Sequence, residues 1–167
     1  MSSESKNIFA SYLRNFVFGV EDSLVSTVGL LSGVAIAGIQ RKEIFVTGIV
    51  LIFVEAFSMA VGVFLSENSA KEYLRQTEVS SSHSVKNGLI MFVSYFISGM
   101  VPLFPYIVLP IAIAFWYSIG ASLAALFLLG VIGGKISRIN IFSTGIKTLF
   151  IGGVAVAVGV IVGKIAA

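Results

Sequence analysis

Charged residues are scarce in this sequence, and cysteine is absent. Asp, Glu, Lys and Arg together make up 11% of the 167 residues, whereas 57% of the residues are hydrophobic. A soluble globular domain carries about 25% charged residues, because water must solvate its surface. The exterior of a chain with so little charge must face lipid instead. The sequence therefore predicts an integral membrane protein.

The lack of cysteine and the near absence of histidine exclude much of enzyme and cofactor chemistry. Without a thiol the chain has no disulfide, no thiolate metal site and no cysteine nucleophile. The single histidine, His83, lies in a serine-rich stretch, where we expect it to be solvated. The sequence also shows no Ser-His-Asp set, no glycine-rich phosphate loop and no His/Glu cluster of a membrane protease. We therefore expect no enzyme activity and no cofactor.

Long apolar runs separated by polar stretches predict an all-α fold with five membrane-spanning helices. A bilayer core of about 30 Å takes about 20 helical residues. The charge-free run from Asn87 to Gly134 is too long for one crossing, and we expect its three prolines to turn the chain back. The predicted spans are about 16–39, 44–66, 87–104, 107–132 and 145–165, with a polar loop at 67–86. The whole chain, 1–167, is then a single transmembrane domain.

The distribution of basic residues predicts the orientation of these spans, since Lys and Arg gather in cytoplasmic loops. Eight of the eleven basic residues fall on the side of the N-terminus: Lys6, Arg14, Lys71, Arg75, Lys86, Lys135, Arg138 and Lys147. The other side has Arg41, Lys42 and Lys164. The N-terminus is therefore expected in the cytoplasm. Basic loops also explain the net charge of +3, so no nucleic-acid partner is expected.

Two acids interrupt the first predicted span, although a charge at membrane depth costs at least about 2.5 kcal/mol. Asp22 heads a helical stripe of small residues that lie within about 80° of one another: Ser26, Gly29, Gly33 and Ala37. Small residues let two helices approach closely in lipid, so Asp22 is expected in a helix–helix seam. Glu21 points about 100° away and could reach the membrane surface. An alternative is that Asp22 caps a helix end or a kink near Gly19.

The second predicted span repeats this arrangement around Glu55. Glu55 and Met59 lie four residues apart and share one helix face with Gly48, Gly62 and Ser66. A carboxylate and a thioether therefore point the same way near the middle of the span. Glu55 could alternatively be a protonated acid bonded to a backbone carbonyl. Because intramembrane acids mark ion paths or proton relays, the faces that carry Asp22, Glu55 and Met59 predict a polar pathway.

Four separate stretches resemble one known family. VFGVEDSLVSTVGLLSGVAIAG is similar to the first-helix signature of the vacuolar iron transporter (VIT) family, and EAFSMAVGVFLSENSAKEY is similar to its second-helix signature. FISGMVPLFPY resembles the family's turn after helix three, and GGKISRINIFSTGIKTLFIGGVAVAVGVIVGKI resembles its last segment. The match runs in order from about residue 16 to the C-terminus.

The resemblance implies a five-helix protomer that forms a homodimer with a metal path between subunits. Such a protein exports Fe²⁺ or Mn²⁺ from the cytosol in exchange for protons, so metal ions are its substrates. The family's pathway Asp aligns with Asp22 and its pathway Met with Met59, so the resemblance implies that Asp22, Met59 and the nearby Glu55 are the candidate metal ligands. The expected location is the plasma membrane in a prokaryote or the vacuolar membrane in a eukaryote.

Three departures from the family pattern keep other functions open. Well-studied members insert a glutamate-rich metal-binding domain between helices two and three, where this chain has residues 67–86 with the acids Glu67, Glu72 and Glu78. Ser23 replaces the usual glycine after the first-helix acid. Val63 stands where many bacterial members have Glu, while Glu55 stands where a small residue is expected. The alternatives are a structural or regulatory membrane protein of the same fold that does not transport, and a transporter of a different cation.

Overall fold

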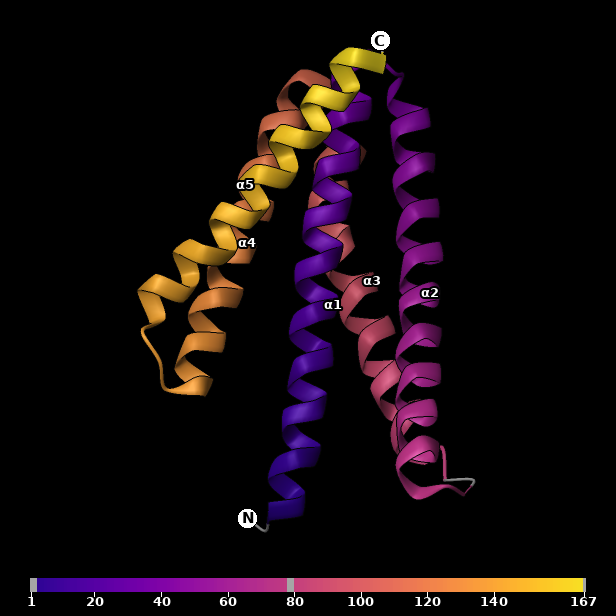
Figure 1. The fold of residues 1–167 in the computed structure, drawn as a ribbon. Coiled ribbons are helices and arrows are strands. Elements are labelled where there is room, and N and C mark those ends of the chain that lie inside the picture. Colours follow the sequence, from indigo (N-terminus) through magenta and orange to yellow (C-terminus); the bar gives the residue numbers. More distant parts are fainter. Residues whose placement is uncertain (1–2, 78–79, 167) are drawn as a thin grey trace.

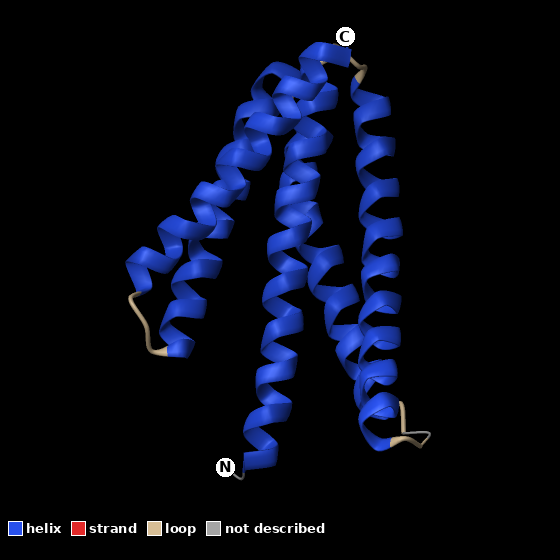
Figure 2. Ribbon diagram, in the orientation of Figure 1, coloured by secondary structure: helices blue, strands red, loops and turns tan. Residues whose placement is uncertain are grey.

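The computed structural model describes residues 3–77 and 80–166, and over these ranges the chain forms five helices and no strand (Figure 2). The helices are α1 (Ser3–Ile36), α2 (Arg41–Arg75), α3 (Ser82–Val108), α4 (Ile111–Ser137) and α5 (Ile141–Ala166). Each is long and apolar enough to cross a membrane. The predicted all-α fold with five spans is confirmed.

The helices run up and down between two ends of a bundle (Figure 1). The N-terminus, the α2–α3 connection and the α4–α5 turn lie at one end, here called the N-terminal end. The α1–α2 turn, the α3–α4 turn and the C-terminus lie at the opposite end. α1 occupies the centre, with α2 on one side and the α4–α5 pair on the other (Figure 1). α1 packs chiefly against α3 and α5. It therefore joins the α2–α3 pair to the α4–α5 pair.

The helices extend beyond the predicted spans at the N-terminal end. α2 continues to Arg75 and α3 already begins at Ser82, so most of the expected loop at 67–86 is helical. Gln76 ends α2 in the left-handed conformation (φ 52°), and its N–H bonds to the Glu72 carbonyl. The residues around this end, rich in Glu, Lys, Ala and Leu, favour helix in water as well as in lipid. Glu78 lies outside the described residues.

The predicted turn in the charge-free run is misplaced by several residues. α3 continues through Pro102 and Pro105 as far as Val108, and the chain turns at Pro110, which precedes α4. Prolines persist inside membrane helices where neighbouring side chains bond the carbonyls that a proline leaves free. The Ser118 hydroxyl of α4 donates a 2.7 Å hydrogen bond to the Pro102 carbonyl, which ties α4 to this stretch of α3.

Glycines allow α1 and α5 to approach until their backbones touch. A Cβ atom built on Gly33 would lie 2.6 Å from the Gly159 carbonyl oxygen. Cβ atoms on Gly159 and Gly163 would meet the backbones of Gly29 and Gly33 in turn. The predicted small-residue stripe that follows Asp22 on α1 therefore forms a helix–helix seam, and its partner is α5 of the same chain.

Replacing Gly159 with valine should destabilise the protein, because the branched side chain has no room beside α1. Overpacking of this kind typically removes about 1–3 kcal/mol of stability. Gly153→Val on the same helix is the matched control. A Cβ at Gly153 would meet no other part of the structure within 4 Å. Both changes raise helix propensity equally, so their difference in unfolding by detergent titration isolates the α1–α5 contact. Equal stability of the two variants would contradict this account of the seam.

Candidate functional site

α1 and α2 converge on one turn of α3 because Gly99 leaves space there. A Cβ atom at Gly99 would lie 2.7 Å from Ile52 Cγ1 of α2 and 2.9 Å from Ser23 Oγ of α1. Ser23 also donates a 2.6 Å hydrogen bond to the Tyr95 carbonyl, one turn earlier on α3. These contacts fix the relative height of α1 and α2. They bring two carboxylates to the same level of the bundle, one directly before Ser23 and one three residues after Ile52.

These carboxylates belong to Asp22 and Glu55, and the structure brings them within electrostatic range of each other. Both side chains are half-buried. Within residues 3–77 and 80–166, neither carboxylate has a hydrogen-bond or ion-pair partner. Asp22 does not cap a helix end, because α1 runs unbroken from Ser3 to Ile36. The alternatives of a kink near Gly19 and of a protonated Glu55 bonded to a backbone carbonyl stay predictions.

The Tyr95 hydroxyl is a third polar group at this level. It lies within electrostatic range of both Asp22 and Glu55. A 2.8 Å hydrogen bond joins it to Ser26 Oγ, which lies one helical turn beyond Asp22 on α1. Tyr95 is itself fully buried. Its hydroxyl is therefore held on the α3 side of the two acids.

Met59 is half-buried one turn beyond Glu55 on α2, as the shared helix face predicted. In the described part of the chain, no three His, Cys, Asp or Glu side chains gather closely enough to hold a metal ion. The described part of the chain thus supplies two unpaired carboxylates, with a thioether on the same face of α2. That Asp22, Glu55 and Met59 bind metal stays a prediction.

A cleft of about 590 Å³ lies between α1 and α2, on the N-terminal side of the two acids. Its lining residues are Arg14, Asn15, Val17, Phe18, Glu21, Val63 and Ser66. Glu21 is half-buried and faces this cleft. Val63 of α2 lies on the opposite wall. Glu55 is not among the lining residues, so its carboxylate occupies a different place from that of a glutamate at position 63.

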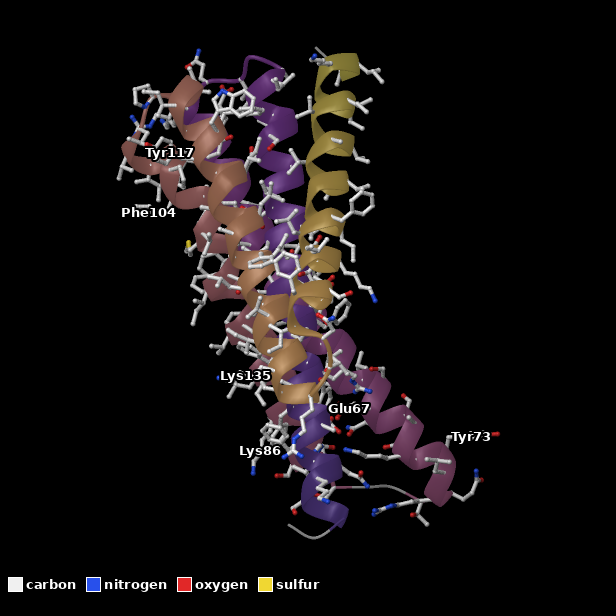
Figure 3. All side chains as sticks on the ribbon, turned by 90° about the vertical axis from the view of Figure 1, so that its left-hand side faces the viewer. Glu67, Tyr73, Lys86, Phe104, Tyr117 and Lys135 are labelled. Atoms are coloured by element: carbon white, nitrogen blue, oxygen red, sulfur yellow. The ribbon has the colours of Figure 1, made fainter. Side chains whose placement is uncertain are left out.

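Glu67 forms a second polar centre at the N-terminal end, where α1, α2 and α3 meet (Figure 3). Its side chain is 12% exposed. Asn87 Nδ2 of α3 donates to both carboxylate oxygens at 2.7 Å. From α1, Asn15 Nδ2 and Ser11 Oγ donate at 3.3 and 3.4 Å. One carboxylate therefore bonds to both helices that flank its own.

Three basic groups also face Glu67. Arg14 Nη2 lies 3.4 Å from Oε1, while Lys71 Nζ and His83 Nδ1 each lie 3.8 Å from Oε2. His83 stacks on the Tyr12 ring, with centroids 5.2 Å apart. The prediction that His83 is a solvated loop residue is wrong, because α3 begins before it. The Glu67 cluster is defined here as Ser11, Arg14, Asn15, Glu67, Lys71, His83 and Asn87.

The sequence interpretation missed Tyr95 and the Glu67 cluster. Tyr95 stands beside Ser94 and Ser98 in a run without charge, and that concentration of hydroxyls was the available signal. The partners of Glu67 come from positions 11–15, 71, 83 and 87, and all of these except Asn87, at the start of the third predicted span, were expected outside the spans. No periodicity links such distant positions. Their meeting follows only from the extension of three helices beyond the membrane core.

Comparison with known proteins gives two matches. The sequence model of the VIT family matches residues 13–87 and 76–164. The chain is also 28% identical over 163 residues to the uncharacterized protein MJ0645 of Methanocaldococcus jannaschii, covering 87% of this chain and 84% of the relative. The family match covers both halves of the bundle, including Asp22, Glu55, Met59 and Tyr95. The chain therefore belongs to the VIT family, a family of membrane metal-ion transporters.

Proposed function

We propose that this protein exports divalent transition-metal cations, Fe²⁺ or Mn²⁺, from the cytosol in exchange for protons. The observation that carries the proposal is the pair of unpaired, half-buried carboxylates of Asp22 and Glu55. They come from two different spanning helices of a VIT-family chain. Acids at such positions are expensive to maintain and serve ion paths or proton relays.

The ligand chemistry supports a transition metal as the substrate. Carboxylate oxygens suit Mn²⁺ and Fe²⁺, whereas a thioether binds softer metals and adds little for Mg²⁺ or Ca²⁺. Met59 supplies this thioether on the face of α2 that bears Glu55. We assign Asp22 and Glu55 as the oxygen ligands and Met59 as the group that selects against the hard cations.

The same two carboxylates supply a physical basis for proton coupling. Two negative charges close together in a region of low dielectric repel each other strongly. A cation between them, or a proton on one of them, relieves that repulsion. Metal and proton thus compete for the same oxygens, so release of one favours binding of the other. The Tyr95 hydroxyl, held by Ser26, is placed to stabilise the carboxylate that remains charged.

A homodimer would complete the site. The described residues of one protomer offer no set of three acidic, histidine or cysteine ligands. A two-fold axis beside α1 and α2 would double every ligand, because a symmetric interface repeats each residue on the partner. Two copies each of Asp22, Glu55 and Met59 then surround one path.

The arrangement of charge supports export. The N-terminus and the α2–α3 connection share one end, and Lys86 lies in the same half of the bundle, as Figures 1 and 3 show. By the positive-inside rule, the basic residues of that end support a cytoplasmic location for it. The α1–α2 cleft is on that side of the acids, so metal reaches the site from the cytosol. Its release is then on the side of the C-terminus.

Asp22→Asn and Glu55→Gln should each lower Mn²⁺ uptake into proteoliposomes by at least about 10-fold, the loss seen even for residues that only support a metal ligand. Each change keeps the side-chain shape and removes the charge. Glu72→Gln is the matched control, since Glu72 is an exposed acid on the same helix as Glu55. Full transport by both site variants would exclude this mechanism. Absence of uptake of any divalent metal by the unaltered protein would favour the non-transporting alternative.

Met59→Leu should alter metal selectivity more than the rate of transport. Leucine keeps the volume of methionine, so the packing cost is small, below about 1.5 kcal/mol. The competition of Mg²⁺ and Ca²⁺ against Fe²⁺ uptake is expected to rise several-fold once the thioether is lost. Met100→Leu serves as the control, because Met100 packs against the hydrophobic core. An unchanged competition profile would remove Met59 from the ligand set.

A further inference from the structure

Arg14 belongs to both polar features of the N-terminal end. Its guanidinium Nη2 lies 3.4 Å from Glu67 Oε1. The same side chain lines the α1–α2 cleft, where Glu21 is the acidic residue. The Arg14 side chain is 68% exposed, whereas that of Glu67 is 12% exposed. The arginine is thus the exposed partner of the pair and the glutamate is the buried one.

Glu67 is fixed because its carboxylate is bonded from both neighbouring helices. The Asn87 amide holds both oxygens from α3, and the Asn15 amide holds Oε1 from α1. Asn87 is fully buried and Asn15 is nearly so. The negative charge therefore cannot move away from the rim of the cleft. The Glu67 carboxylate keeps the Arg14 guanidinium beside it and neutralises the positive charge of that group.

Without that negative charge, the Arg14 guanidinium would have Glu21 as an acidic partner in the same cleft. A guanidinium released from Glu67 would neutralise Glu21 and oppose the approach of any cation to the cleft. Clefts with apolar walls concentrate the electric field, so a single charge changes the local concentration of ions strongly. Val17, Phe18 and Val63 provide such walls here.

We propose that Glu67 is a positioning residue for cation access: it holds Arg14 at the rim of the α1–α2 cleft, so that Glu21 keeps the cleft attractive to cations. The identification of the cation as a transported metal rests on the function proposed above. The electrostatic role of the Arg14–Glu67 pair does not, and it can be measured without transport.

The test uses a single cysteine introduced as Val63→Cys, which is unambiguous because the natural chain has no cysteine. The purified full chain is labelled with a cationic and an anionic methanethiosulfonate reagent of similar size, and the ratio of the two rates is measured. We expect a ratio above one. Glu67→Gln should lower the ratio by about 10-fold, the lower range of steering effects. Adding Arg14→Gln to Glu67→Gln should restore it.

Lys71→Gln in the Glu67→Gln background is the matched control. Lys71 also faces Glu67 but does not line the cleft, so its removal should leave the lowered ratio unchanged. A ratio that Glu67→Gln does not alter would overturn the proposal. So would restoration by Lys71→Gln as complete as that by Arg14→Gln. If Glu67→Gln fails to fold, Arg14→Gln alone decides: the ratio should rise, and no change would overturn the proposal.

Metal uptake separates this inference from the proposed function. In proteoliposomes, Glu67→Gln should raise the KM for Mn²⁺ about 10-fold and leave kcat unchanged, because only access is altered. Arg14→Gln should restore the KM. If the unaltered protein transports no metal while the labelling ratios change as expected, the proposed function fails and the electrostatic inference stands. If transport occurs and the ratios do not change, the inference alone fails.

Discussion

The close approach of α1 to its neighbours is the constraint on which the rest of the structure depends. Glycines on the partner helices make this approach possible, at Gly99 on α3 and at Gly159 and Gly163 on α5. A helix held on two sides cannot rotate, so the direction of Asp22 is fixed by backbone contacts rather than by a bond of its own. The unpaired carboxylate can therefore be kept in place without a partner that would occupy its oxygens.

Both polar centres contain carboxylates, but only one centre supplies them with bonding partners. Glu67 has amide, hydroxyl and basic partners from three helices, so its charge is fully compensated and it joins the helices. Glu55 and Asp22 have no such partners among the described residues. A buried charge without compensation is unfavourable, and natural proteins keep one where its charge has a use. The presence or absence of bonding partners therefore separates the structural acid, Glu67, from the candidate ligands.

The sequence alone predicted the five helices, their order, the candidate acids and the small-residue seam, because each follows from local composition or helical periodicity. It failed where long-range packing decides. Polar residues 67–75 and 82–86 were expected in a loop, yet they continue α2 and α3, since partners from other helices bond their side chains. Pro102 and Pro105 were expected to end a helix that instead continues to Val108, where it packs against α4. The Tyr95 hydroxyl could not be placed beside Asp22 without knowing that α1 and α3 meet at Ser23.

The acids Glu21 and Glu55 place negative charge at two different levels of the bundle. Val63 leaves one wall of the α1–α2 cleft apolar, so Glu21 is the acid that lines it. Glu55 instead adds its charge at the level of Asp22, two helical turns further from the N-terminal end. With a single acid in the cleft, the balance there is sensitive to one nearby basic side chain. A fixed partner for Arg14 then matters more than it would if the cleft held a second acid.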